Sequence, residues 1–188
     1  MSTFILSGNT SDFTTCHHSV NLDPNKKYEA ALLSLDTYNS IPNITAGINN
    51  VLSYSTDNGK TWKSIDLGTG AYELKAIDNE IKRQLIANRD SDNAISITAN
   101  VSRLTSIVSI ERSTYKIDFG VENSIGPVLG FGAVVIGNGY NESPNIVDIM
   151  KVNSILVNLD IIAGSHVNGA PSSVIYSFYP NVAPGYKI

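Results

Sequence analysis

The segment that most constrains the fold of this chain is the long strand-like stretch Lys151–Ala163. Successive side chains of an extended chain point to opposite sides, so this stretch has one almost wholly apolar face and one mixed face. A helix over Val152–Ile162 is the alternative, but the β-branched residues and the turn signal at Asn168-Gly169 favour a strand. The sequence therefore predicts a strand here, and a second strand returning over Ser172–Tyr179.

The rest of the chain also favours short strands and turns. Asp57-Asn58-Gly59 gives the strongest hairpin signal, because Asn-Gly pairs suit tight turns between strands. Further strands are expected over Thr3–Leu6, Tyr28–Tyr38, Val51–Ser55, Thr61–Ile65, Ala94–Val101, Leu104–Ile110, Tyr115–Phe119 and Ala133–Ile136. The segments Asn39–Asn50 and Gly137–Pro144 are expected to be loops.

One amphipathic helix is expected over about residues 73–88. Apolar residues recur there at helical spacing, and no Gly or Pro interrupts Ala71–Arg89. A short helical turn, capped by Ser124, is expected over Ile125–Phe131. Many short strands with one helix predict an all-β fold, an antiparallel β-sandwich of the jelly-roll type, as a single domain over residues 1–188.

The composition excludes several classes of function. Charged residues make up 16% of the 188 residues and the net charge is −4, so no basic surface for nucleic acid is expected. Cys16 is the single cysteine, which excludes an intramolecular disulfide framework. No signal peptide and no membrane span are predicted, so intracellular assembly is the expected setting.

Ser55, Asp57, Gly59 and Trp62 match the Asp-box pattern S-x-D-x-G-x-x-W, which resembles the hairpins of sialidases and other β-propellers. In that resemblance the box is a structural element, remote from the catalytic groups. Asp57 is expected to bond turn amides, and Gly59 to adopt a positive φ. The chain holds one copy and four arginines, so a glycosidase is disfavoured and a structural hairpin is expected.

Other candidate chemistry is weaker. Cys16-His17-His18 offers metal ligands, but adjacent residues rarely converge on one ion. Asp90-Ser91-Asp92 lacks the remaining ligands of a calcium loop. No nucleophile elbow or phosphate-binding loop is present. The sequence therefore predicts no catalytic, cofactor-binding or metal-binding residues and no enzyme.

Three short signatures carry a resemblance to a known family. They are Gly70-Ala-Tyr72-Glu-Leu at the helix start, Ser124-Ile-Gly126-Pro-Val-Leu129-Gly130-Phe131, and the C-terminal segment with Pro184, Gly185 and Tyr186. With the strand predicted before Pro42, they resemble proteins encoded by Maverick/Polinton elements and their adintovirus relatives. The resemblance implies a minor capsid or penton protein, a jelly roll that closes icosahedral vertices of a virion as a homopentamer, with the major capsid protein of the same element as partner.

Members of that family continue with further strands beyond the segment that ends at Ile188, so C-terminal strands are expected to be missing here. An open sheet edge would then remain for another subunit to cover. The alternative function is a receptor- or glycan-binding β-sandwich, such as a trimeric fibre head, suggested by the Asn- and Ser-rich loops. A glycosidase based on the Asp-box is the third and least favoured hypothesis.

Overall fold

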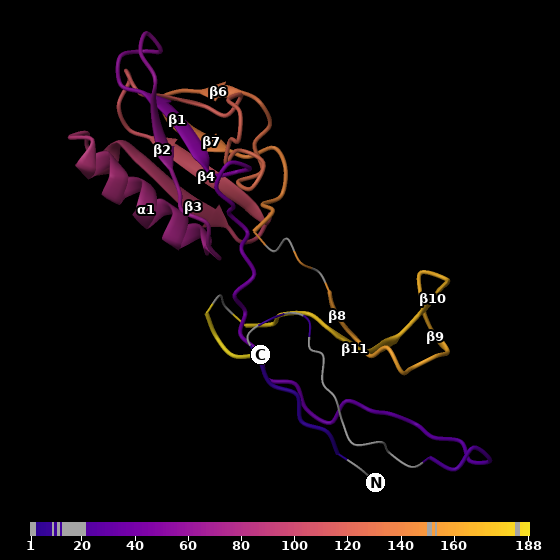
Figure 1. Cartoon of the computed structure of the whole chain (residues 1–188). Coiled ribbons are helices and arrows are strands. Elements are labelled where there is room, and N and C mark those ends of the chain that lie inside the picture. The colour runs from indigo at the N-terminus through magenta and orange to yellow at the C-terminus, as the bar shows by residue number, and fades with distance from the viewer. Residues whose placement is uncertain are drawn as a thin grey trace. The chain divides into compact units, whose positions relative to one another are not determined.

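The computed structural model describes residues 3–8, 10, 12, 22–149, 152, 154–182 and 185–188 (Figure 1). It divides the chain into two units, residues 1–31 and 32–188. The described part of the first unit holds one turn, in which the Lys26 N–H donates to the Asp23 carbonyl at 3.0 Å. It contains no helix or strand, so the strand expected over Thr3–Leu6 is wrong.

The second unit contains a compact body, residues 43–149, built on two antiparallel sheets. The first sheet has the order β2 (Lys63–Asp66), β1 (Val51–Ser55), β5 (Lys116–Asp118), β6 (Val135–Ile136). The second has the order β3 (Ile95–Asn100), β4 (Thr105–Ile110), β7 (Gly139–Glu142). A 3-10 turn, η1 (Asp92–Ala94), precedes β3.

One α-helix, α1 (Leu74–Ala87), packs against β3 and confirms the predicted helix (Figure 1). Its apolar stripe of Leu74, Ile77, Ile81 and Leu85 is buried, as the helical spacing requires. The carboxylate of Asp78 is also turned inward, where it accepts the backbone N–H of Ile97 at 2.7 Å. The helix ends at Ala87, and Arg89, with a φ of +60°, turns the chain away from the helical path.

The hydrophobic core lies entirely within the body. The buried aliphatic and aromatic residues of the described chain all fall between Ile44 and Ile136. They form one cluster, to which both sheets, α1 and the turn at residues 125–131 contribute. Antiparallel sheets with one helix therefore make up the fold of the body.

Beyond the body, two strand pairs form what we call the ribbon, residues 155–178. β8 (Ile155–Asn158) pairs antiparallel with β11 (Val174–Phe178). A hairpin of β9 (Ser165–Val167) and β10 (Ala170–Ser172) lies between them in the chain. Its turn residues Asn168 and Gly169 have φ of +50° and +81°, as the Asn-Gly signal predicts. Among the described residues of the long strand expected over Lys151–Ala163, only the four of β8 form a strand.

Two further expectations are corrected and a third is confirmed. The strand expected over Tyr28–Tyr38 does not form: only Tyr38 makes a β-bridge, to Lys187, because the other residues have no partner strand. The expected loop Gly137–Pro144 contains β7, which pairs with β4. The short helical turn expected after Ser124 does form, because the Leu129 N–H donates to the Ile125 carbonyl at 3.2 Å and the Ser124 hydroxyl accepts the Gly126 N–H at 3.1 Å.

Candidate functional site

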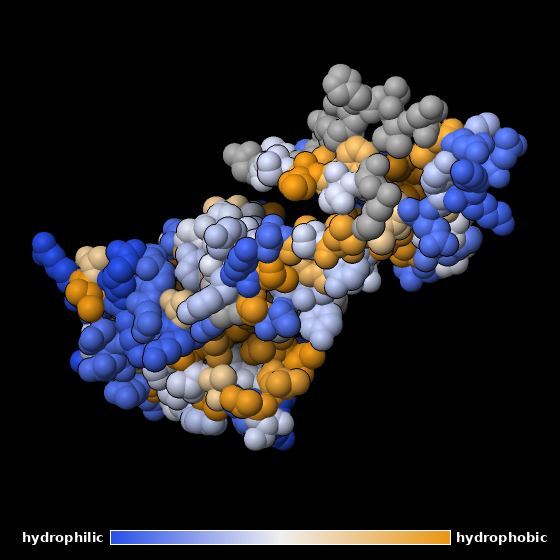
Figure 2. Space-filling model, turned by 90° about the horizontal axis from the view of Figure 1, so that it is seen from below, coloured by the Kyte–Doolittle hydropathy of each residue, from blue (hydrophilic) through white to orange (hydrophobic). Residues whose placement is uncertain are grey.

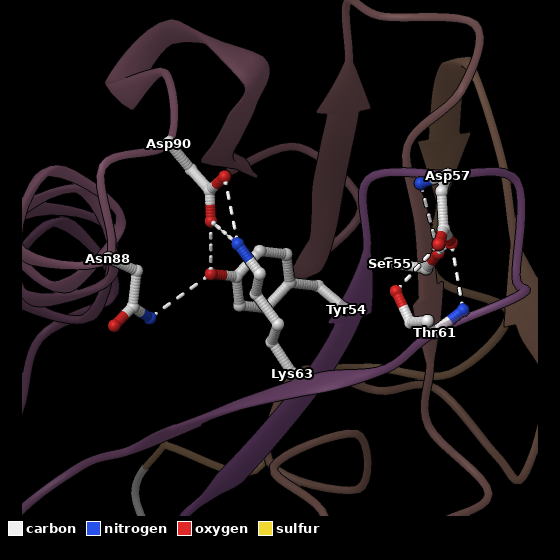
Figure 3. A network of polar contacts seen from close by, with 7 residues as sticks. All are labelled: Tyr54, Ser55, Asp57, Thr61, Lys63, Asn88 and Asp90. Atoms are coloured by element: carbon white, nitrogen blue, oxygen red, sulfur yellow. Dashed lines mark hydrogen bonds and ion pairs between the residues drawn. The ribbon is translucent and has the colours of Figure 1, made fainter.

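The turn between β1 and β2 is organised by the carboxylate of Asp57 (Figure 3). One oxygen of Asp57 accepts the backbone N–H groups of Lys60 and Thr61 at 3.0 and 2.8 Å. The other accepts the Thr61 hydroxyl at 2.6 Å. These bonds, led by the Thr61 hydroxyl, hold the pKa of Asp57 well below its usual range.

The remaining Asp-box residues complete the same turn. The Ser55 hydroxyl donates to Asp57 at 2.8 Å and accepts the Gly59 N–H at 2.8 Å. Gly59 has a φ of +88°, and the Trp62 ring lies over it, 3.6 Å from where a Cβ would stand. The hydrogen bonds that Ser55 and Asp57 make through their side chains all lie within the turn, so the cluster presents a folded hairpin and not a reactive group.

A second polar network joins the sheet to the end of α1 (Figure 3). The hydroxyl of Tyr54, a fully buried side chain, donates to Asp90 at 2.6 Å and accepts the Asn88 amide at 3.1 Å. Lys63 closes the network with hydrogen bonds of 3.1 and 2.8 Å to the two Asp90 oxygens. Burial, and then the bond to Asp90, raise the pKa of Tyr54 far above its usual range, so the phenol stays neutral.

Asn43 is a buried polar clamp that the sequence did not single out. Its side-chain amide donates to the carbonyls of Tyr72 and Ile149 at 2.8 and 3.0 Å. Its side-chain oxygen accepts the Tyr72 N–H at 2.8 Å. These contacts span up to 106 residues of sequence, so no local pattern could reveal them.

Gly70 and Tyr72, two residues of the first signature, are part of the contacts around Asn43. Gly70 exchanges backbone hydrogen bonds with Ile44, and a Cβ at Gly70 would lie 2.8 Å from the Tyr72 ring. Only glycine fits under this ring without a shift, since real Cβ atoms do not approach so closely. The first signature is therefore explained by packing at the base of the body.

The second signature forms a crowded corner of the core. A Cβ at Gly126 would lie 2.9 Å from Phe119, whose ring stacks on Phe131 at a centroid distance of 4.8 Å. Leu129 is fully buried, and its carbonyl accepts the Ser106 hydroxyl at 2.6 Å. Gly130 has a φ of +82°, and a Cβ there would overlap the Asn145 carbonyl. These residues fix backbone paths and offer no free polar group.

The third signature lies outside the body. Gly185 has a φ of +85° and donates its N–H to the Asn39 carbonyl at 2.8 Å. The Tyr186 carbonyl accepts the Asn39 N–H at 2.9 Å, while its side chain is 67% exposed. Pro184 and Cys16-His17-His18 lie outside the described residues. The three signatures thus occupy three separate places and do not converge on one site.

A shallow groove of about 530 Å³ lies between the free edges of β6 and β7. Its lining includes Phe131, Val134, Tyr140 and Glu142. The Glu142 carboxylate is already engaged by Thr105, Asn100 and Arg103 at 2.6 to 3.0 Å, and these contacts lower the pKa of Glu142, the Thr105 hydroxyl most. The groove therefore offers an exposed tyrosine and apolar walls rather than a free acid or base.

The part of the chain that the structure describes shows no group of three or more His, Cys, Asp or Glu side chains that could hold a metal ion. Within that same part, every buried side-chain nitrogen and oxygen has a hydrogen-bond partner. No helix in the described ranges is long and apolar enough to cross a bilayer. The described surface does carry exposed hydrophobic side chains.

Exposed large hydrophobic residues lie both in the body, where Val101 is 79% exposed, and outside it. Leu33, Tyr38, Ile161, Tyr176 and Tyr179 are between 48% and 80% exposed. Figure 2 shows hydrophobic side chains at the surface in several separate places. Comparisons with protein-family models, curated proteins and solved structures found no match to this chain.

Proposed function

We propose that this protein is a structural capsid protein, a minor capsid or penton subunit that closes icosahedral vertices as a homopentamer. The resemblance of three signatures to the Maverick/Polinton family suggests this role. In the proposal the subunit acts in the virion, alongside the major capsid protein of the same element, and its fold is a jelly roll completed on assembly. It has no enzymatic activity and needs no cofactor.

The observation that carries the proposal is the uneven burial of hydrophobic residues. The core is confined to the body, while residues 32–38 and the ribbon keep leucines and tyrosines exposed. Contact with a partner subunit would remove such exposed apolar side chains from water, which is favourable. A subunit whose strands are covered only in a shell would have this distribution.

The composition and the polar clusters support the same role. Subunit interfaces are depleted in charge and enriched in tyrosine. Only 16% of the residues are charged, and there are nine tyrosines. The carboxylates of Asp57, Asp90 and Glu142 are engaged in internal hydrogen bonds. A rigid scaffold with engaged carboxylates suits assembly better than catalysis.

Light scattering behind size exclusion tests the proposal, together with negative-stain images of the same peak. We expect a mass near five times 20.2 kDa and five-fold rings. Co-expression with the major capsid protein should place the chain at particle vertices. A protein that stays monomeric at high concentration and never joins a shell would contradict the proposal.

A glycan- or receptor-binding module is the second candidate, favoured by the groove beside β7. Tyr140 is 67% exposed there, and a tyrosine ring is a suitable platform for a sugar. A glycan array with the wild type and with Tyr140→Ala tests this candidate. Binding that is lost in Tyr140→Ala, together with a trimeric mass, would favour this module over the penton subunit.

A further inference from the structure

The β8–β11 pair of the ribbon has one apolar face, on which Ile155, Val157 and Phe178 are half-buried and Tyr176 is exposed. Register pairs Ile155 with Phe178 and Val157 with Tyr176. Paired residues of an antiparallel ladder point to the same side, so these four side chains share one face. The rings of Tyr176 and Phe178 stack at a centroid distance of 6.1 Å, and Tyr176 is still 48% exposed. A sheet face of this kind is stable when another layer or strand covers it.

Both edges of the β8–β11 pair are also free. Among the described residues, β8 pairs only with β11 and β11 only with β8. Free edges present a row of unpaired N–H and C=O groups to which an extended chain can add. Asp160 is the single Asp, Glu, Lys or Arg between residues 155 and 178. These edges therefore lack the charged side chains that oppose the addition of another strand.

The same chain carries an extended segment that has the sequence of a strand and no strand partner. We call residues 32–38 the leading segment. Leu33 and Leu35 share one face of it and are 63% and 38% exposed. Its C-terminal end is fixed, because the Ile188 N–H donates to the Thr37 carbonyl at 2.8 Å and Lys187 pairs with Asp36 at 2.8 Å. Residues 32–35 make no such backbone bonds within the described chain.

We propose that the leading segment of one subunit adds as a strand to the free edge of the ribbon of the next subunit. This inference rests on the proposed function, since it names the contact surface of the proposed homopentamer. The occupant is a second copy of this chain, because the chain holds both an unpaired strand segment and an unpaired edge, each apolar and nearly uncharged.

The symmetry of the contact supports this choice. A segment that binds a different surface of its neighbour makes a heterologous contact, and such contacts give a ring when the rotation between neighbours closes and an open filament when it does not. Pairing of one ribbon with another ribbon would be isologous and would stop at a dimer. A ring with an odd number of subunits needs the heterologous contact, which the leading segment and the ribbon supply.

The test uses the full chain and two substitutions that place a charge on the proposed contact. Leu33→Asp lies on the leading segment and Tyr176→Asp on the ribbon, both outside the core. We expect each variant alone to fall from the ring to a monomer of about 20.2 kDa. The matched control is Ile86→Asp, at a 59% exposed position on α1, which should keep the ring mass.

Mixing the two variants sharpens the test. The Leu33→Asp subunit retains an intact ribbon and the Tyr176→Asp subunit an intact leading segment. One contact can therefore form and the closing contact cannot, so the mixture should give a heterodimer of about twice 20.2 kDa. Thermal unfolding of the body should match the wild type in both variants, which separates lost assembly from lost folding.

The outcomes separate this inference from the proposed function. If the wild type forms a ring and Leu33→Asp forms the same ring, the contact surface is wrong and the penton proposal stands. A mixture that stays monomeric while each variant also stays monomeric would contradict the head-to-tail arrangement. A wild type that never assembles would overturn both.

Discussion

The body and the ribbon contain the same kinds of apolar residue but differ in how far these side chains are buried. In the body, Ile77, Ile81 and Leu85 are completely buried between α1 and the sheets. In the ribbon and the leading segment, Ile161, Tyr176 and Leu33 are 48% to 80% exposed. Sequence composition therefore does not decide burial in this chain; the presence of a second layer does.

The difference follows from how sheets are stabilised. Each sheet of the body has the other sheet, α1 or a turn packed against it, so its apolar face is removed from water. The β8–β11 pair has two strands, and Tyr176 on its apolar face remains 48% exposed. Two-stranded sheets are marginal in water by themselves. The body should therefore fold by itself, and the ribbon should gain its stability from a partner.

The largest expected effect compares two isoleucines. Ile81→Ala should lower the free energy of unfolding of the body by about 2–5 kcal/mol, because it leaves a cavity in a closed core. Ile161→Ala, at an 80% exposed position, should change it by less than about 0.5 kcal/mol. Urea unfolding followed by tryptophan fluorescence measures both. Equal losses would show that the two regions unfold as one unit.

A pair of glycines gives the next effect. Gly130 and Gly185 have similar positive φ values, but a Cβ is obstructed only at Gly130. Gly130→Ala should destabilise the body by about 2 kcal/mol or more, from backbone strain and overlap with Asn145. Gly185→Ala adds strain of about 1 kcal/mol outside the body. Differential scanning calorimetry of the body should show a lower Tm only for Gly130→Ala. A lower Tm for both variants would contradict the independence of the body from the segment around Gly185.

Tyr54 offers a test of the body through pH. Its pKa is raised in the folded state by burial and by Asp90, so the folded chain keeps a proton that the unfolded chain loses near pH 10. The contribution of Tyr54 to the free energy of unfolding is fully present below pH 10. It falls as the pH rises further, by up to about 1.4 kcal/mol per pH unit. Tyr54→Phe should cost about 1–2 kcal/mol at pH 7 and remove this component.

The urea midpoint measured between pH 8 and pH 11 for wild type and Tyr54→Phe checks the result. The difference between the two proteins isolates Tyr54 from the other groups that titrate in this range. A constant difference across the range would mean that the Tyr54–Asp90 bond is not maintained in solution.

The smallest expected effect is local to the β1–β2 turn. Asp57→Asn keeps the shape of the side chain but removes the charge that accepts three hydrogen bonds from Lys60 and Thr61. We expect amide exchange at these two residues to become a few-fold faster, with no change in the ribbon. Because the pKa of Asp57 is lowered, the wild type should approach the variant as the pH falls below about 4. Unchanged exchange would show that the turn holds without the carboxylate.

Sequence patterns predicted correctly those elements whose formation depends on residues close together in the sequence. The helix bounds follow from the spacing of Leu74, Ile77, Ile81 and Leu85, and β1 has the expected bounds. The Asn168-Gly169 turn forms where its backbone preferences place it. These features need only neighbours within a few residues.

The sequence predictions that failed share one cause: they depend on pairing between residues that lie far apart in the sequence. Tyr28–Tyr38 alternates as a strand does, but a strand also needs a partner. Gly137–Pro144 has the composition of a loop, yet β7 forms there because β4 offers an edge. Asn43 and Glu142 act through contacts with residues far along the chain, and one sequence carries no sign of such contacts.

The clamp at Asn43 has a consequence for the modular construction of the chain. Its amide nitrogen lies 3.0 Å from the Ile149 carbonyl oxygen, so the first and last residues of the body are adjacent in space. Domains whose ends lie close together can be inserted into, or removed from, another chain without disturbing either part. Residues 43–149 therefore have the geometry of a unit inserted into a longer chain, and an exchange of this unit would leave the segments on either side of it unchanged.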